Sequence, residues 1–505
     1  MTNIFKRLAA AVLVLVLAVS MVACKKEDPN AAAAKEAQKT DAVTVGEHTL
    51  SAVELNYFFV DAVSNWYSQY GNYVYYLNFD PKKPLNQQVI SGTTGETWAD
   101  SFLETALENI RSTYALYDQA MADETFQLTE SEQKALDAVI PDLDALIEYY
   151  NKLYTSYGYE YPYSNTADYL RSIYGAGATT KNYAEYYRVC TIATSYYERY
   201  SESLKFDDTA LRDYEKDKYG RYSSYSFAVY YVSASAYENA DAAKSAADQL
   251  ASVRYDNVKA FDEAIAQLPV NAGKDNPTLS TSYDGVLYAK IESSYVEWLA
   301  EEGRTTGDMT VIPNEVTSGE KTTVSGYYVV RFEAADTNEM LLKNVRHILI
   351  KFEGGTFNST TGQTTYSDAE KMAAKSEAEK LLMEFRTGSM TELRFSDLAN
   401  RHSDDGDGTT GGLYENVYPG QMVSAFNDWC FDPSRNVGDT GLVESEFGWH
   451  VMYFVGNTAY TFRDYMITND LRVETVSAWF DSISKDYKAE LVSDELVPKD
   501  MVLSK

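Results

Sequence analysis

The sequence predicts an α+β protein of several domains, in which both ends of the chain build one helical body and two β-sheet domains lie between them. Three observations lead to this fold class. Apolar residues recur at helical spacing over about 150 residues after position 51, and again between 462 and 487. Short runs of β-branched and aromatic residues dominate the stretch from 222 to 455. The same succession of motifs occurs twice within that stretch, which indicates an internal repeat.

The first residues have the pattern of an export signal. A Lys-Arg pair at positions 6 and 7 precedes an apolar run from 8 to 22, which is short for a membrane span and ends in small residues suited to cleavage. A cysteine directly after such a run, here Cys24, resembles the signal of bacterial lipoproteins. The resemblance implies cleavage before Cys24, a lipid on its thiol and a flexible tether over residues 24–40. An ordinary signal peptide of residues 1–23, followed by an unrelated cysteine, is the alternative.

Composition argues against several classes of function. The 505-residue chain has a formal net charge of -31, which argues against a nucleic-acid partner. The four histidines and three cysteines are scattered along the chain, so we expect no metal site and no cofactor. Cys190 and Cys430 fall in different predicted domains, and we therefore expect no structural disulfide between them.

Residues 41–215 are expected to form a helical domain. A strand and turn at 43–50 lead to Ser51, which makes a capping box with Glu54 at the start of a helix. A later apolar stripe steps by three and four residues through Leu103, Leu107, Ile110, Tyr114, Tyr117 and Met121. Tyrosine is unusually common, with 43 residues in the chain. Its broad ring and polar tip suit either an adaptable binding surface or a tyrosine-rich core, and the sequence leaves both open.

The chain is organised around the stretch from 346 to 455. It opens with a strand-like run, Arg-His-Ile-Leu-Ile, and continues with an amphipathic helical pattern between 373 and 385. The later motifs are Phe-Ser-Asp-Leu-Ala-Asn-Arg-His-Ser-Asp-Asp, Gly-Gly, Gly-Gln-Met-Val-Ser-Ala-Phe, Val-Gly-Asp and Phe-Gly-Trp-His-Val. Two of the four histidines, His347 and His450, stand at opposite ends of this stretch, each on a predicted strand.

This order of motifs resembles the parvulin family of peptidyl-prolyl isomerases. No single motif is specific, but all of them in this order are hard to obtain by chance. The sequence departs from the family at 413–416, where Asp-Leu-Gly would be expected after the glycine pair and Leu-Tyr-Glu-Asn is found. The resemblance implies a parvulin domain over residues 340–459, with the element order βα3βαβ2. It also implies cis/trans isomerisation of X–Pro bonds without a cofactor.

The resemblance implies roles for individual residues as well. The implied catalytic network consists of His347, Asp405 and His450. The implied substrate site consists of Tyr414, Met422, Phe426 and Ser445. The barrier to rotation, about 18–20 kcal/mol, comes from amide resonance, so the catalyst has to favour the twisted amide and needs no nucleophile. Taken alone, Met422 and Phe426 are typical of an ordinary helix core, and a lone histidine on a strand is typical of a buried structural residue.

Residues 222–335 repeat the organisation of this unit. The run from 226 to 232 parallels the first strand at 345–351. A Tyr-x-x-Trp motif at 295–298 precedes Gly-Asp, just as Phe-x-x-Trp precedes Gly-Asp in the later copy. The repeat predicts a degenerate parvulin-like domain over residues 222–335.

The two copies differ at the histidine positions. With the strand runs aligned as above, Ala228 takes the place of His347 and Tyr328 takes the place of His450. We therefore expect the first copy to keep the fold, to lack the histidine pair and to be inactive. It would serve as a binding or spacing module.

The final segment, residues 460–505, contains one more amphipathic helix. Its apolar side chains are Ile467, Leu471, Trp479, Phe480 and Ile483. Because the parvulin unit has already ended at Val455, we expect these side chains to complete the core of the N-terminal domain. Helices first and last with isomerase domains between resemble the exported foldases of the PrsA and SurA type, which implies a chaperone body that holds unfolded exported chains.

We interpret the chain as a lipid-anchored foldase on the outer face of the cell membrane, or on the periplasmic side in a cell with two membranes. Its partners would be unfolded or partly folded exported proteins, and the sequence leaves a homodimer open. The alternative is a holdase or assembly factor whose parvulin domains only bind chains. A lipoprotein solute receptor is a weaker third interpretation, because no α/β alternation over two lobes is visible.

Overall fold

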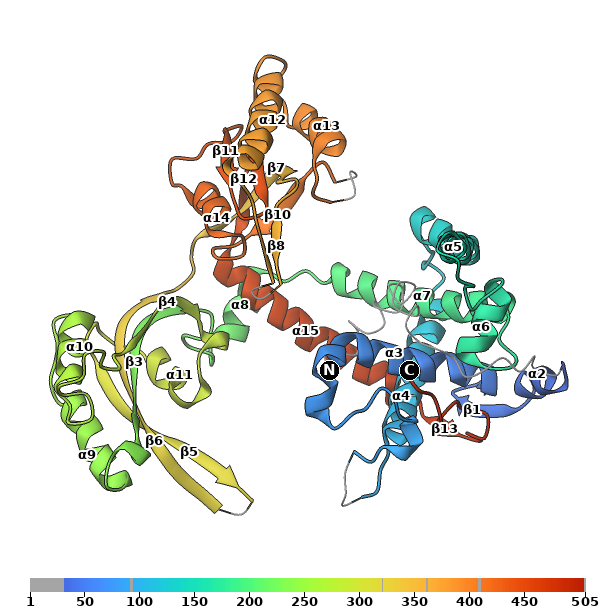
Figure 1. Cartoon of the computed structure of the whole chain (residues 1–505), viewed down its shortest axis with the longest axis horizontal. Coiled ribbons are helices and arrows are strands. Elements are labelled where there is room, and N and C mark those ends of the chain that lie inside the picture. Colours follow the sequence, from blue (N-terminus) through green and yellow to red (C-terminus); the bar gives the residue numbers. More distant parts are fainter. Residues whose placement is uncertain (1–30, 91–93, 320, 360–361, 407–409, 504–505) are drawn as a thin grey trace. The chain divides into compact units, whose positions relative to one another are not determined.

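The chain divides into two compact units. The computed structural model describes residues 31–90, 94–319, 321–359, 362–406 and 410–503, whose helices and strands are drawn in Figure 1. One unit comprises Met1–Lys205 and Arg472–Lys505, and the other comprises Phe206–Leu471. The predicted fold class, with both ends of the chain in one helical body, is confirmed. The expected signal peptide and the lipidation of Cys24 lie outside the described residues. The flexible tether expected over residues 24–40 is wrong in its second half, because α2 (Ala31–Ala37) is helical and Ala37 is buried in the core of the first unit. Within the described ranges, no helix is long and apolar enough to cross a membrane.

The first unit is the helical body. Its N-terminal helices are α2 (Ala31–Ala37), α3 (Ala52–Tyr70), α4 (Trp98–Ala122), α5 (Glu130–Ser156), α6 (Thr166–Tyr174) and α7 (Thr180–Ser203), with short 3-10 turns η3 (Gly71–Leu77) and η4 (Leu85–Gln87). Helix α3 begins at the predicted capping box, where Ser51 Oγ accepts the Glu54 N–H and the Glu54 carboxylate accepts the Ser51 N–H at 2.7 Å. The predicted stripe along α4 is buried at Leu103 and Ile110. Tyrosine is found both in the core of this body and on its surface.

The C-terminal segment completes the body. Helix α15 (Phe462–Ser484) belongs to the body from Arg472 onward. There Phe480 is buried against Leu116 of α4 and Ala193 of α7. A short strand, β13 (Ala489–Leu491), pairs antiparallel with β1 (Asp41–Val45), which also pairs with β2 (His48–Ser51). Both side-chain packing and strand pairing therefore tie the two ends of the chain together.

The first part of α15 departs from the prediction. We expected Ile467 and Leu471 in the core of the body, but they pack with Leu211 and Tyr222 of the second unit. The helix has 23 residues and so is about 34 Å long. That length is enough for one apolar stripe to contribute to two separate cores. Helix α8 (Asp208–Glu215), which we expected in the body, likewise belongs to the second unit.

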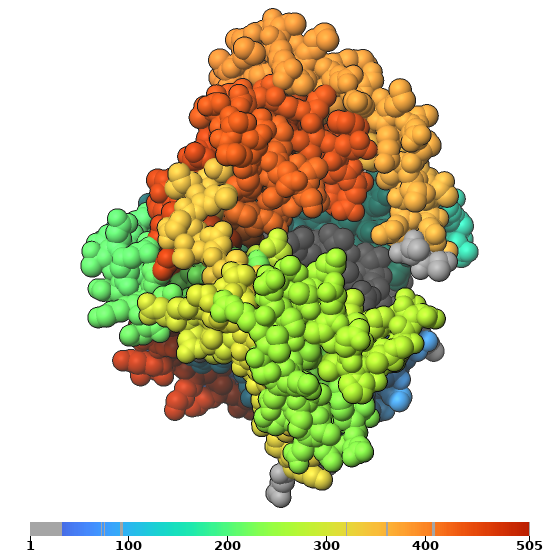
Figure 2. Space-filling model, turned by 90° about the vertical axis from the view of Figure 1, so that its left-hand side faces the viewer, coloured from blue at the N-terminus to red at the C-terminus, as the bar shows by residue number. Residues whose placement is uncertain are grey.

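The second unit contains two domains with the same order of elements. The first copy runs β3 (Ser224–Ser233), α9 (Ala240–Ala251), α10 (Val258–Ala266), β4 (Thr281–Leu287), α11 (Ser293–Ala300), β5 (Met309–Ser318) and β6 (Lys321–Asp336). The second copy runs β7 (Leu341–Lys351), α12 (Asp368–Arg386), α13 (Glu392–His402), β10 (Leu413–Val417), α14 (Ser424–Phe431), β11 (Thr440–Glu444) and β12 (Gly448–Thr461). The sheet orders are β4-β3-β6-β5 and β10-β7-β12-β11, antiparallel throughout. In Figure 2 the first copy is green to yellow and the second is orange to red.

The copies also share an arginine–tryptophan contact. Arg304 lies 3.9 Å from the ring of Trp298, and its Nε donates to the Trp298 carbonyl oxygen at 2.8 Å. In the second copy Arg435 lies 4.1 Å from the ring of Trp429, and its Nε donates to the Trp429 carbonyl oxygen at 3.1 Å. The sequence repeat therefore corresponds to a structural repeat down to individual contacts.

The Gly-Asp motif marks the same turn in both copies. Gly307 has φ +90° and donates its N–H to the Phe332 carbonyl oxygen at 2.8 Å. Gly438 has φ +88° and donates to the Phe454 carbonyl oxygen at 2.9 Å. A positive φ is accessible to glycine at little cost, which explains why both copies carry glycine here.

The strand alignment of the first copy needs a correction of one residue. Gly326 pairs with Ser233, whereas Gly448, its counterpart, pairs with Lys351. Counting back along β3 from this pairing places Val229, not Ala228, at the position of His347. The side chain of Ala228 lies in the core beneath α9 and α10, while Val229 packs on the opposite face with α11. Shifting the alignment by one residue moves each side chain of the strand to the other face of the sheet, so the alignment decides which residue replaces His347.

The second copy also departs from the expected βα3βαβ2 order. Two helices, α12 and α13, lie between β7 and β10 in the described residues, where the resemblance implied three. A hairpin of β8 (Thr356–Asn358) and β9 (Gln363–Thr365) precedes them.

Candidate active site

The two histidines of the second copy meet on one face of the sheet. His347 lies on β7 and pairs with Met452, and His450 lies on the neighbouring strand β12 and pairs with Leu349. Their Nδ1 atoms are 3.1 Å apart, and their ring centroids are 5.3 Å apart at an interplanar angle of 26°. Only 3% of His347 and 5% of His450 is exposed. The pair is therefore a buried, directly hydrogen-bonded unit.

Asp405 and Tyr414 extend this unit on the side of His347. The Asp405 Oδ2 atom is 3.0 Å from His347 Nε2 and accepts a hydrogen bond from the Tyr414 hydroxyl at 2.8 Å. Asp405 is held by the loop after α13, where Ser403 Oγ accepts the N–H of Asp405 at 3.2 Å and the N–H of Leu349 at 3.1 Å. Ser403 thus fixes the loop that carries Asp405 to strand β7.

Ser445 extends the unit on the side of His450. Its Oγ is 2.7 Å from His450 Nε2 and accepts the N–H of Phe447 at 3.2 Å. Ser445 follows β11, in the hairpin that leads into β12. Five side chains therefore form one continuous chain of hydrogen bonds, in the order Tyr414, Asp405, His347, His450 and Ser445.

The protonation states follow from burial and neighbouring charge. Burial lowers the pKa of His347, against the opposing effect of Asp405. Burial, assisted by His347, lowers the pKa of His450 to about 4. Burial alone would raise the pKa of Asp405, but hydrogen bonds from Tyr414 and His347 bring it below its usual value. Both histidines are therefore neutral near pH 7, and Asp405 is a carboxylate.

These states fix the direction of every hydrogen bond. The Asp405 carboxylate only accepts, so His347 carries its proton on Nε2 and leaves Nδ1 as an acceptor. His450 must then donate from Nδ1 to His347, which leaves its own Nε2 to accept the Ser445 hydroxyl proton. The two histidines have opposite tautomers, and all protons in the chain point towards Asp405.

An apolar wall stands against the histidine pair. The Phe426 ring, from α14, is 5.4 Å from the His347 ring and 5.4 Å from the His450 ring. Met422 is half-buried in the same cluster, and the Tyr414 ring is 6.4 Å from that of Phe426. The geometry places apolar and aromatic side chains directly against a pair of neutral, hydrogen-bonded imidazoles.

The structure brings all seven predicted catalytic and substrate residues into this one cluster, whereas Cys24 lies outside the described residues. Their catalytic and binding roles stay predictions. The hydrogen bond between Tyr414 and Asp405 was not foreseen, and no sequence signal pointed to it, because Tyr414 lies in the segment that departs from the parvulin pattern, which forms strand β10. Within the described ranges, no group of three or more side chains could hold a metal ion.

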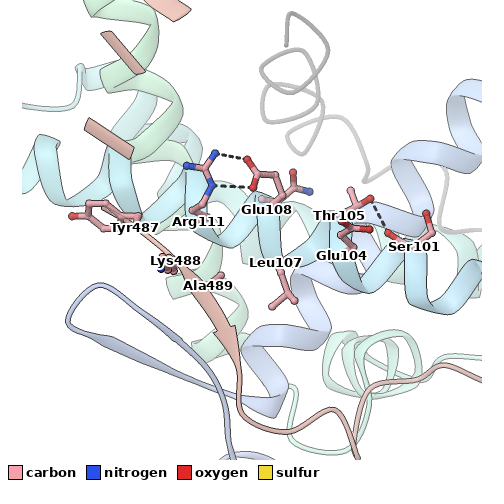
Figure 3. A pocket seen from close by; sticks show the side chains of 10 residues that line it. Ser101, Glu104, Thr105, Leu107, Glu108, Arg111, Tyr487, Lys488 and Ala489 are labelled. Carbon is pink, nitrogen blue, oxygen red and sulfur yellow. Dashed lines mark hydrogen bonds and ion pairs between the residues drawn. The ribbon is translucent and has the colours of Figure 1, made fainter. Parts of the chain in front are cut away.

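A second concave region lies in the helical body. This cleft of about 490 Å³ runs between α4 and residues 487–489, and Figure 3 shows its lining side chains. Its most prominent charges, Glu108 and Arg111, pair with each other, with Arg111 Nε donating to Glu108 Oε2 at 2.9 Å.

Comparisons with known proteins agree with the geometry of the second copy. Residues 327–457 match the family model described as Rotamase_3, a PPIC-type PPIase domain. The chain thus contains a parvulin-type peptidyl-prolyl isomerase domain, and the predicted resemblance is confirmed. No curated protein matches the sequence.

Three solved structures illustrate the similarity. PrsA from Bacillus subtilis is 12% identical, with 82% of this chain and 98% of that chain covered and a TM-score of 0.26. A SurA-like chaperone structure from Campylobacter jejuni, reported for PEB4 and Cj1289, is 12% identical, with 79% and 96% covered and a TM-score of 0.18. The peptidyl-prolyl isomerase ESS1 from Candida albicans is 26% identical, with 23% and 62% covered and a TM-score of 0.17. At these TM-scores, the assignment of the domain rests on the family model and on the site.

Proposed function

We propose that the second copy catalyses the cis/trans isomerisation of X–Pro peptide bonds and that the whole chain is an extracytoplasmic foldase. One observation carries the proposal: two neutral histidines, hydrogen-bonded to each other, lie buried beneath the Phe426 ring in a domain that the isomerase family model matches. The substrates are unfolded or partly folded exported proteins that present proline.

The site fits a reaction in which no bond breaks. The barrier of about 18–20 kcal/mol is the amide resonance that is lost when the bond twists. Met422 and Phe426 hold the proline ring, while the rest of the peptide rotates against it. Because the histidines are neutral and fully engaged with each other, they place no net charge beneath the ring. A buried, hydrogen-bonded pair of this kind, beside apolar side chains, favours the twisted amide, which has less charge separation than the planar forms.

The experiment measures turnover by the full chain on a short X–Pro peptide, by exchange spectroscopy that needs no coupling protease. We expect the H347A/H450A variant to lose at least about 100-fold in kcat/KM, as befits removal of positioned catalytic groups. The matched control is H402A, since His402 lies exposed at the end of α13 in the same domain. A folded double variant with wild-type turnover would show that the histidine pair has no catalytic role.

The second candidate function is a holdase that binds chains without isomerising them. The observation that favours it is the first copy, which keeps the fold with Val229 and Tyr328 in place of the histidines. Suppression of client aggregation by the wild type and the H347A/H450A variant separates the two. Equal suppression together with no turnover in the wild type would favour the holdase.

The proposed location rests on the sequence. A lipid on Cys24, after cleavage of residues 1–23, would anchor the chain to the outer face of the membrane. Metabolic labelling with a fatty acid checks this, and the C24A variant should lose the label and appear in the soluble fraction. A labelled C24A variant, or an unlabelled wild type at the membrane, would contradict the lipid anchor.

A further inference from the structure

Tyr414 links the wall of the pocket to the hydrogen-bonded chain. It lies on β10, in the segment where Asp-Leu-Gly was expected and Leu-Tyr-Glu-Asn is found. Its ring centroid is 5.0 Å from that of His347, and its hydroxyl donates to Asp405 Oδ2 at 2.8 Å. Any large apolar residue could supply the wall. The hydroxyl therefore needs a separate explanation.

The charge on Asp405 decides the direction of the whole chain. While Asp405 is a carboxylate, His347 must donate from Nε2, and every other proton follows. If Asp405 held a proton, its O–H could donate to His347 Nε2 and each bond beyond it would reverse. Ser445 would then accept from His450, and its own proton could turn to the Gly448 carbonyl oxygen, 3.4 Å away, or to a substrate. The pocket contains the same atoms for either direction of the hydrogen bonds, but different atoms act as the donors.

Few groups keep Asp405 charged. Its side chain is 38% exposed, and the groups that act on it are His347 and Lys351 from β7 and Tyr414 from β10. Lys351 Nζ donates to the carbonyl oxygen of Asp404 at 2.7 Å. Among the hydrogen bonds found in the described part of the domain, Tyr414 supplies the hydroxyl donor to the carboxylate.

We propose that Tyr414 is a positioning residue, whose hydroxyl orients the Asp405 carboxylate against His347 and so fixes the tautomers of both histidines. The ring completes the pocket wall and the hydroxyl sets the direction of the hydrogen bonds beneath it. As a contribution to catalysis this inference rests on the proposed isomerase function. As a statement about tautomers it stands apart from that function and can be tested without turnover.

The first experiment observes the tautomers directly. The chain has only four histidines, so imidazole ¹⁵N spectra of the full chain labelled at histidine are simple. In the wild type we expect His347 protonated at Nε2 and His450 at Nδ1. In Y414F we expect the midpoint of the Asp405 titration to rise, because the carboxylate loses a donor, and the mixture of both directions to appear at a correspondingly higher pH than in the wild type. The signals of His48 and His402, which lie outside the hydrogen-bonded chain, should not move, and the amide spectrum reports that the variant is folded.

Two further variants calibrate the spectra. In D405N the side-chain amide can donate to His347 Nε2, so this variant should show the reversed direction. The matched control is Y283F. Tyr283 of β4 pairs with Phe227 of β3, just as Tyr414 of β10 pairs with Val345 of β7. Y283F makes the same change in the copy without histidines, and no histidine signal should move.

Kinetics complete the test. We expect Y414F to lower kcat by about three- to tenfold, with KM within about twofold of the wild type, since the ring remains in the wall. A raised KM at unchanged kcat, or unchanged tautomers and Asp405 midpoint, would overturn the proposal. If the wild type shows no isomerisation but the tautomers still respond to Y414F, the proposed function fails and the positioning role stands.

Discussion

The two β-sheet domains have the same fold and differ at the floor of one pocket. Both use the order of strands, the Arg–Trp contact and the Gly-Asp turn described above. In the second copy this floor consists of His347 and His450, and in the first copy Val229 and Tyr328 take their places. The ring centroids of Tyr295 and Tyr328 are 5.5 Å apart, so Tyr295 lies against Tyr328 in the way that Phe426 lies against His450. The fold is therefore specified by features away from the pocket. The proposed chemistry would depend on a few positions at which the fold tolerates either set of residues.

The largest effect is expected when the two histidines of the second copy are replaced by the corresponding residues of the first copy. The H347V/H450Y variant should lose at least about 100-fold in kcat/KM, because no hydrogen-bonded imidazole pair remains. It should stay folded, since the first copy folds with a valine and a tyrosine at these positions. Peptide exchange spectroscopy measures the activity, and amide hydrogen exchange measures the fold.

The reverse exchange provides the control. V229H/Y328H should gain no turnover, because the network of the second copy also needs Asp405 and Tyr414. If the second copy unfolds in the H347V/H450Y variant, the main role of the histidine pair is to stabilise the fold. Activity in the converted first copy would show that the pair alone suffices.

The next effect is on acid stability. The pKa of His450 is about 4 in the folded chain and about 6.5 when unfolded. Between these pH values the unfolded chain binds a proton that the folded chain does not. The contribution of His450 to the free energy of unfolding is therefore fully present above pH 6.5 and is lost as the pH drops towards 4. The loss is on the order of 3 kcal/mol from His450. Asp405, whose pKa is lowered, loses its contribution only below about pH 4.

The first copy contains no histidine and should lack this loss. Hydrogen exchange at pH 7 and pH 5, corrected for intrinsic rates, resolves the two copies within one sample. Protection should fall in β7 and β12 and remain in β3 and β6. The H347V/H450Y variant should remove the difference. Equal loss in both copies would mean that other groups control acid stability.

The comparison also shows what the sequence could reveal. The motifs around His347 and His450 are local, so they predicted the two strands, whereas the pairing of the histidines followed from the resemblance to the parvulin family. The alignment of β3 was not fixed locally, because both faces of that strand are covered and its apolar run has no alternation. Ala228 and Val229 were equally suitable until the pairing of Gly326 was known. The bond from Tyr414 to Asp405 crosses a glycine-rich loop, and no periodicity reports such a contact.

A smaller effect is expected at the shared Arg–Trp contact. R304M and R435M should each destabilise their own copy by about 1–2 kcal/mol, from the loss of a cation–π contact and a hydrogen bond. Both side chains are largely covered, at 18% and 16% exposed, so the loss should be similar. Turnover of R435M should stay within about threefold of the wild type. Local hydrogen exchange checks the stability, with K380M, at an exposed site on α12, as the control. Very unequal losses would show that the copies are stabilised differently.

The smallest effect is expected for phosphorylated substrates. A phosphate on serine before proline brings a charge of about −1.5 to −2, which arginine pairs or lysines would have to meet. The segment from Glu353 to Asp368, which contains the β8–β9 hairpin, has no lysine or arginine. Lys371, just beyond it, pairs with Glu444 at 3.5 Å and lies 5.6 Å from the Phe352 ring. In the first copy, β3 is followed by a short 3-10 turn, η5 (Ala234–Ala236), before α9. The hairpin thus distinguishes the second copy without adding positive charge.

We therefore expect peptides with phosphoserine before proline to react at the same rate as unmodified peptides or up to about threefold more slowly, because an unpaired dianion gains nothing in the pocket. Exchange spectroscopy on matched peptides gives both rates under one set of conditions. Raising the salt concentration should reduce any difference between the two rates, because salt screens the repulsion between the phosphate and the acidic chain that would cause it. A tenfold preference for the phosphorylated peptide, equal to about 1.4 kcal/mol, would require a cationic site that the hairpin does not provide.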